Sequence, residues 1–141
     1  MRTVFADAGY WIALLNRKDE LHKKAKAVSA SLGQVRIVTS EMVLTEVLNF
    51  FSDRGPELRE VAVSSAQRLR SDPNVTVVQQ TSLQFQSAIK LYSERGDKAW
   101  SLSDCASILI MREQGIQEAL THDRHFAQAG FTPLLRDDTY S

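Results

Sequence analysis

Four acidic residues stand where an α/β protein places its functional groups, at the carboxyl ends of strand-like segments or in the helices that follow. They are Asp7, Glu46, Asp104 and Asp123. Ligands of open α/β sheets bind at the edge formed by the carboxyl ends of the strands. Two carboxylates about 5 Å apart repel by roughly 3 kcal/mol at an effective dielectric constant of about 20. Four converging acids would therefore require a hard divalent cation such as Mg²⁺ or Mn²⁺.

Each acid also has a structural explanation when it is considered alone. Asp7 directly follows an apolar strand-like segment and could cap the next helix. Asp104 completes the capping-box pattern Ser101-x-x-Asp104. Asp123 could form a turn, and Glu46 could be an exposed glutamate on an amphipathic helix. The joint placement of the four acids at one sheet edge favours the metal site.

The elements that would position these acids alternate between strand and helix. Strands are predicted at Thr3–Ala6, Val35–Val38, Val75–Val78, Glu118–Thr121 and Thr132–Leu135. Helices are predicted between them, and the almost wholly apolar segment Asp104–Arg112 indicates a buried one. This alternation predicts an α/β fold with three layers, in which a mainly parallel sheet carries helices on both faces. The length of 141 residues fits a single domain spanning 1–141.

Composition narrows the class of protein. Lys+Arg and Asp+Glu balance at 17 each, so any binding of a polyanion must rest on a local basic patch or on metal. Cys105 is the single cysteine and is expected in the core of a protein from a reducing compartment. Asp7 interrupts the N-terminal apolar run too early for a signal peptide, and no run is long enough for a membrane span. We expect a cytoplasmic protein with no membrane association.

The sequence does not favour a zinc site, a phosphate-binding loop or a serine nucleophile. Three histidines and one cysteine lack the spacing of a zinc site. A surface position is the favoured interpretation of His125, with contact to a substrate phosphate as the alternative. Strand alternation predicts that Thr121 and Asp123 share one face while His122 points to the other. The sequence contains neither a glycine-rich phosphate loop nor a serine nucleophile elbow.

Four short segments in order resemble the PIN-domain family and, within it, the VapC-like toxins of bacterial toxin–antitoxin pairs. They are Val4–Asp7, Thr45–Asn49, Ser101–Ser107 and Leu120–Phe126. The resemblance spans the whole chain and implies the PIN-like α/β fold with an acidic, metal-binding pocket. Many relatives carry Ser or Thr and Asn shortly after the first Asp, where this chain has Ala8-Gly9-Tyr10.

The resemblance implies an endoribonuclease that hydrolyses single-stranded or structured RNA with Mg²⁺ or Mn²⁺. The metal ligands, directly or through water, would be Asp7, Glu46 and Asp104. Asp123 would hold a second ion or orient the attacking water, and Thr121 would help to position that water. A carboxylate pocket without a nucleophilic side chain suits metal-assisted phosphodiester hydrolysis on chemical grounds as well.

The resemblance also implies a homodimer and a small antitoxin partner, which would dock near the helices at Glu41–Ser52 and Pro56–Arg70. Candidate RNA contacts are Lys23, Lys24, Arg68, Arg70, Lys98 and Arg124. The main alternative function is a catalytically silent PIN-like RNA-binding or scaffold protein. A phosphate-accepting receiver is disfavoured because Asp7 is unpaired, and a haloacid-dehalogenase-like phosphatase is excluded because Asp-x-Asp is missing there.

Overall fold

The computed structural model describes residues 1–136, which form a five-stranded parallel sheet in the order β3-β2-β1-β4-β5. The strands are β1 (Arg2–Ala6), β2 (Val35–Ser40), β3 (Val75–Val78), β4 (Glu118–Leu120) and β5 (Thr132–Pro133). The helices are α1 (Ala8–Leu15), α2 (His22–Leu32), α3 (Glu41–Phe51), α4 (Pro56–Ser71), α5 (Ser82–Glu94), α6 (Leu102–Gln114) and α7 (Arg124–Gln128). The predicted elements are all present, with ends that shift by a few residues.

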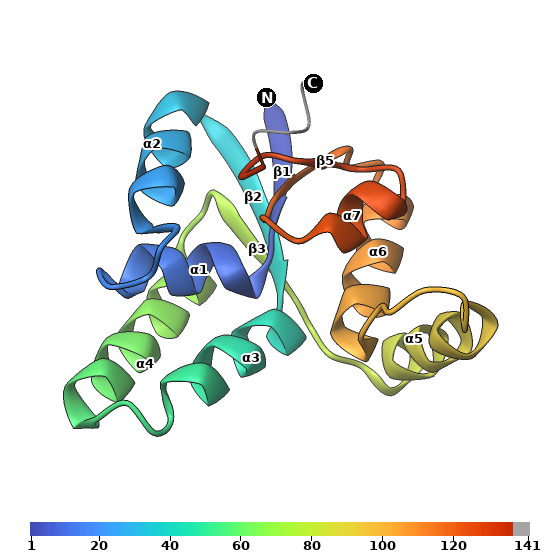
Figure 1. Ribbon diagram of the computed structural model, residues 1–141, viewed down its shortest axis with the longest axis horizontal. Helices are drawn as coiled ribbons and strands as arrows, with labels where there is room; N and C mark the ends of the chain where they lie inside the picture. Colours follow the sequence, from blue (N-terminus) through green and yellow to red (C-terminus); the bar gives the residue numbers. More distant parts are fainter. Residues whose placement is uncertain (137–141) are drawn as a thin grey trace.

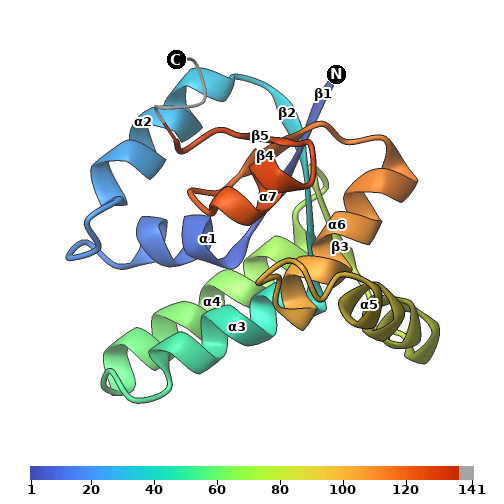
Figure 2. The same cartoon turned by 45° about the vertical axis from the view of Figure 1, so that its right-hand side comes forward.

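Helices cover both faces of the sheet, which confirms the predicted three-layer arrangement. Figure 1 shows α1, α2 and α4 on one side of the strands and α5 and α6 on the other. The turned view in Figure 2 shows α7 crossing in front of the sheet near β4 and β5. A strand with helices on both faces must be apolar throughout, and residues 4–6 of the central strand β1 are fully buried.

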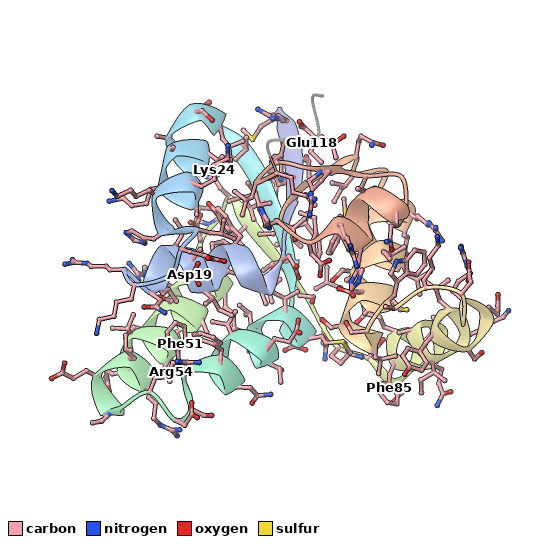
Figure 3. All side chains as sticks on the ribbon, viewed as in Figure 1. Asp19, Lys24, Phe51, Arg54, Phe85 and Glu118 are labelled. Carbon is pink, nitrogen blue, oxygen red and sulfur yellow. The ribbon has the colours of Figure 1, made fainter. Side chains whose placement is uncertain are left out.

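The strands β1 and β4 are neighbours although more than 110 residues separate them. Their pairing runs from Val4 opposite Glu118 to Ala6 opposite Leu120. Arg2 donates two hydrogen bonds of 2.8 Å to the carboxylate of Glu118, which is labelled in Figure 3. The carboxyl ends of the first and fourth strands therefore lie side by side.

Two apolar clusters hold the helices on the sheet. One joins the sheet to α1–α4 and extends to Phe126 of α7, whose ring stacks on Phe5 with the centroids 6.4 Å apart. The other lies between α5 and α6 and includes Trp100 and Cys105, which is fully buried as predicted. The stacking of Phe126 on Phe5 fixes α7, and with it Asp123, against the central strand.

Helix α6 begins two residues before the predicted start because Ser101 is its N-cap. The Ser101 hydroxyl accepts from the Asp104 N–H at 3.0 Å, and the Asp104 carboxylate accepts from the Ser101 N–H at 2.9 Å. The predicted capping box is thus present. Gly115 ends the helix with φ of 67°, a left-handed conformation that glycine adopts without strain. Within residues 1–136, no helix is both long and apolar enough to cross a membrane.

Candidate functional site

A cleft of about 740 Å³ lies at the carboxyl-terminal edge of the sheet and contains all five residues that the sequence singled out. These are Asp7, Glu46, Asp104, Thr121 and Asp123. The cleft is also lined by Ala8, Gly9, Ile12, Asn49, Phe50, Ser101, His122 and His125. The structure thus brings together one acid that directly follows β1, one each from α3 and α6, and one from the loop after β4.

Asp7 is placed by the continuation of the β1–β4 ladder. Its N–H donates to the Leu120 carbonyl at 3.2 Å, one residue beyond the end of β1. Although Asp7 occupies the N-cap position of α1, its side chain makes no capping hydrogen bond. The Thr121 hydroxyl instead donates to Asp7 Oδ2 at 3.1 Å. The carboxylate therefore lies in the cleft and makes no capping hydrogen bond to α1.

Burial dominates the ionisation of Asp7. Loss of solvent, and next the negative charges of Glu46 and Asp104, raise the pKa of Asp7 to about 7. Hydrogen bonds from the Ala8 N–H and the Thr121 hydroxyl oppose this rise without cancelling it. A carboxyl group with a strongly raised pKa in a cleft is typical of a functional site.

Thr121 links two of the acids. Its hydroxyl donates to Asp7 and accepts from the Asp123 N–H at 3.0 Å. It lies just beyond β4, which ends at Leu120 rather than at the predicted Thr121. The strand-alternation argument for His122 is therefore wrong, because the chain has left the sheet and His122 lines the same cleft. Thr121 supplies the hydroxyl contact to Asp7 that Ala8-Gly9 cannot make.

Asp104 carries more hydrogen bonds than the sequence predicted. Its Oδ2 accepts from the Ser101 N–H and also lies 2.8 Å from Nδ1 of His125. The favoured interpretation of His125 as a surface residue is therefore wrong: the side chain is 20% exposed and lies against Asp104, which is 10% exposed. The spacing Asp123-x-His125 indicates only that Asp123 caps α7, and it gives no sign of the contact with Asp104.

Asp123 is both a helix cap and a member of the cleft. Its Oδ1 accepts from the His125 N–H at 2.9 Å and lies 3.2 Å from His125 Nδ1. One candidate ligand atom from each of Asp104, Asp123 and His125 lies within 4.8 Å of the others. Asp123 can therefore cap α7 and also contribute to a cation site.

Glu46 reaches the cleft from the opposite wall. It lies on α3, which Ser40 caps by accepting from the Val43 N–H at 3.1 Å. Glu46 is exposed at the cleft mouth, and Ser103 of α6 donates to its Oε1 at 2.6 Å. Partial loss of solvent, with smaller contributions from the charges of Asp104 and Asp123, raises its pKa. Sequence reasoning assigned no role to Ser103, which ties α3 to α6.

The donor set fits a hard divalent cation. Carboxylate oxygens of the kind that Mg²⁺ and Mn²⁺ prefer line the cleft. Burial, and to a smaller extent the neighbouring negative charges, raise the pKa values of Asp7 and Glu46, and a bound cation would oppose both effects. The ligand roles of the individual acids remain predictions.

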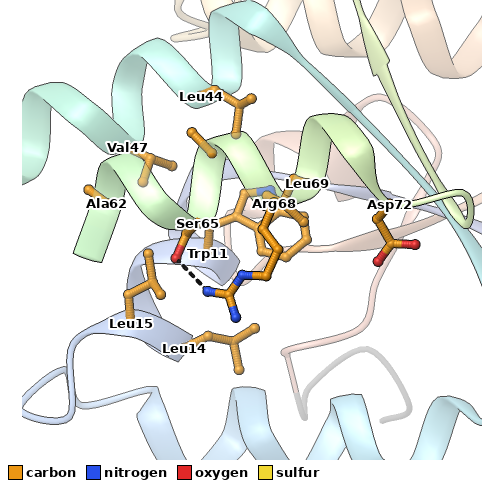
Figure 4. A pocket seen from close by; sticks show the side chains of 11 residues that line it. Trp11, Leu14, Leu15, Leu44, Val47, Ala62, Ser65, Arg68, Leu69 and Asp72 are labelled. Atoms are coloured by element: carbon orange, nitrogen blue, oxygen red, sulfur yellow. Dashed lines mark hydrogen bonds between the residues drawn. The ribbon is translucent and has the colours of Figure 1, made fainter. Parts of the chain in front are cut away.

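A second cavity, of about 260 Å³, lies between α1, α3 and α4 and is mostly apolar (Figure 4). We call it the helical groove. It is lined by Trp11, Leu14, Leu15, Leu44, Val47, Ala62, Ser65, Ala66, Arg68, Leu69 and Asp72. Its walls are the two helices near which the resemblance places a partner, together with α1.

The fold and the cleft define a PIN-domain protein, and the comparisons agree. A model of the PIN domain matches residues 4–132, so the chain belongs to the PIN-domain family. Among curated proteins, it is similar to the 23S rRNA-specific endonuclease VapC20 of Mycobacterium tuberculosis. The two are 31% identical over 131 residues, which cover 93% of this chain and 97% of VapC20.

Solved structures give the same family. The crystal structure of Mycobacterium tuberculosis VapC20, described as a sarcin–ricin loop cleaving toxin, matches with a TM-score of 0.81 and 31% identity, covering 92% of this chain and 96% of that one. The crystal structure of FitAcB from Neisseria gonorrhoeae shares the fold, with a TM-score of 0.66 and 13% identity over 92% and 95% of the two chains. The predicted PIN-like fold is confirmed.

Proposed function

We propose that this protein is a metal-dependent endoribonuclease and the toxin of a toxin–antitoxin pair, built as a single nuclease domain over residues 1–141. The observation that carries the proposal is the convergence of four acids from separate elements on one cleft of a PIN fold. The similarity to VapC20 over nearly its full length supports an RNA substrate.

In this proposal Asp7, Glu46 and Asp104 hold Mg²⁺ or Mn²⁺, directly or through water. A bound divalent ion would supply activation of a water and stabilisation of charge on the phosphate. Asp123 holds a second ion or orients the attacking water. Thr121, whose hydroxyl is fixed between Asp7 and Asp123, helps to position that water.

RNA cleavage by the purified protein tests the proposal. The first substrate to test is 23S rRNA, because VapC20 is a 23S rRNA-specific endonuclease. Cleavage should require added Mg²⁺ or Mn²⁺ and stop with EDTA. Binding of RNA without cleavage under any of these conditions would instead favour the catalytically silent RNA-binding protein. Growth arrest on expression would support the toxin assignment.

The RNA contacts remain to be assigned among the basic residues. Arg124 is exposed and lies in the chain between Asp123 and His125, which both line the cleft. Arg68 lines the helical groove, and Arg70 lies 3.8 Å from the Glu41 carboxylate. We propose Arg124 as the first of these residues to contact a phosphate.

Thr121→Val should reduce cleavage about tenfold, because Asp7 loses the hydroxyl that orients it and lowers its pKa. Thr121→Ser keeps the hydroxyl and should stay within about threefold of the wild type. Single-turnover rates at saturating Mg²⁺ measure the effect. Equal rates for the valine and serine variants would mean that the hydroxyl has no part in the reaction.

We propose that the helical groove takes an apolar segment of a small antitoxin. The groove is open and apolar, and its walls include α3 and α4. Ser65→Trp, which fills the groove, should abolish rescue by a co-expressed antitoxin encoded next to this gene while leaving RNA cleavage intact. Ser64→Trp, on the exposed side of the same helix, is the matched control and should keep the rescue. Rescue of both variants would place the antitoxin elsewhere.

We also propose a homodimer. Exposed apolar side chains on α5 include Phe85, Ile89 and Tyr92, which share one face by helical spacing, and Figure 3 labels Phe85 at the lower edge of this helix. Such a face suits burial against a second copy. A strictly monomeric mass at micromolar concentration would contradict the dimer.

A further inference from the structure

We propose that His125 is a positioning residue of the metal site: its Nδ1–H holds one oxygen of Asp104 so that the other oxygen, Oδ1, is presented to the cation. This inference rests on the proposed function, since it concerns the metal ion that the nuclease would use. The family resemblance gave His125 no role in metal binding.

One oxygen of Asp104 is already fully used by hydrogen bonds within the protein. Oδ2 accepts from the Ser101 N–H at 2.9 Å and from His125 Nδ1 at 2.8 Å. A carboxylate oxygen has two lone-pair directions in the plane of the group, so two donors occupy Oδ2. Oδ1 is then the oxygen left to bind a cation, and Asp104 would act as a ligand through one oxygen.

His125 is itself held in place by its neighbours in the chain. Its own N–H donates to Asp123 Oδ1 at 2.9 Å, which fixes the backbone at the start of α7. The next residue, Phe126, is fully buried and stacks on Phe5. The backbone that carries the imidazole ring is therefore held against the central strand, which fixes the ring beside Asp104.

The protonation pattern follows from the neighbours of Nδ1. Both atoms near it, Asp104 Oδ2 at 2.8 Å and Asp123 Oδ1 at 3.2 Å, are carboxylate oxygens that can only accept. Nδ1 must therefore carry the hydrogen. An N–H between two carboxylates also draws them together, which lowers the cost of bringing their negative charges into one site.

Direct ligation of the metal by His125 is the competing role. Ligand atoms of Asp104, Asp123 and His125 do lie within 4.8 Å of one another. For Nδ1 to bind a cation, however, it would have to give up its hydrogen and the 2.8 Å bond to Asp104. The geometry points to orientation of a ligand, as with the residues that hydrogen-bond to metal ligands in other sites.

Binding of Mn²⁺ alone to the full-length protein tests the assignment, measured by isothermal titration calorimetry. The three variants are His125→Ala, His125→Asn and His125→Gln. The amide nitrogen of asparagine can take the place of Nδ1, whereas that of glutamine takes the place of Nε2. We expect Mn²⁺ affinity to fall 10- to 100-fold in the alanine and glutamine variants and to stay within about threefold in the asparagine variant.

The controls separate the possible failures. Thermal unfolding of the metal-free variants checks that each one folds. If the alanine variant does not fold, the comparison of the asparagine and glutamine variants tests the assignment. Wild-type affinity in a folded alanine variant would overturn the positioning role and leave the proposed nuclease intact. Weak binding by the asparagine variant, or nitrogen coupling in the electron spin resonance of bound Mn²⁺, would instead assign His125 as a ligand. A wild type that binds no Mn²⁺ would overturn this inference together with the metal-dependent mechanism.

Discussion

Asp7→Asn is expected to cleave RNA at least about 100-fold more slowly than the wild type at saturating Mg²⁺. Asparagine has nearly the shape of aspartate and can still accept the Thr121 hydrogen bond, but it lacks the charge that a cation needs. Loss of a residue that merely orients a metal ligand costs 10- to 100-fold in affinity or activity, so loss of a ligand itself should cost more. Single-turnover cleavage of a labelled RNA gives the rate.

Asp53→Asn is the matched control for this substitution. Asp53 is exposed in the loop between α3 and α4, away from the cleft, and its replacement should leave the rate unchanged. Equal cleavage by the wild type and Asp7→Asn would indicate a contaminating ribonuclease or a different active site. Asp104→Asn tests the second acid in the same way.

The same Asp7→Asn substitution should make the metal-free protein more stable, by roughly 2–4 kcal/mol at pH 8. The folded protein raises the pKa of Asp7 from 3.8 to about 7. Between these two values the folded state binds more protons than the unfolded state, so this contribution to stability is present below pH 4 and is lost as the pH rises through 7. Asparagine has no carboxyl group to ionise, so it avoids the cost of a buried negative charge above pH 7. Its advantage should be full at pH 8 and vanish near pH 4.

Urea unfolding of both proteins in EDTA, at several pH values, gives this difference. The comparison removes the Asp7 charge alone, so the difference includes the loss of its repulsion with Glu46 and Asp104. Added Mg²⁺ should stabilise the wild type and have little effect on Asp7→Asn, since a ligand that binds only the folded state raises stability by mass action. Asp53→Asn should show no gain at any pH. A wild type that is as stable as Asp7→Asn at pH 8 would contradict the buried-charge explanation.

The positions of the acids could be predicted because they depend on local patterns. Asp7 follows a run of apolar residues that could only be a buried strand, and Asp104 stands three residues after a serine in a capping box. In a parallel sheet both features fall at the same edge, so convergence follows from topology. The end of β4 was predicted one residue too late, because a three-residue strand offers little periodicity.

The contacts between the acids and their partners could not be predicted. Ser103 donates to Glu46 across 57 positions, and His125 contacts Asp104 across 21 positions. No spacing in the sequence encodes such pairs, since they arise only when α3, α6 and α7 pack around one cleft. A histidine that follows an aspartate and an arginine is equally compatible with solvent, so the local sequence favoured the wrong assignment for His125.

The hydrogen bond from Thr121 to Asp7 joins the first strand of the protein to a loop 114 residues later. During synthesis β1 emerges early, but β4, its neighbour in the sheet, emerges only near the end. Until then Asp7 has no Thr121 beside it, and Asp123 has not yet been made. Contacts between such distant positions form late. A nuclease with this order of strands would have all four acids in place only after β4 and the loop that follows it have been synthesised.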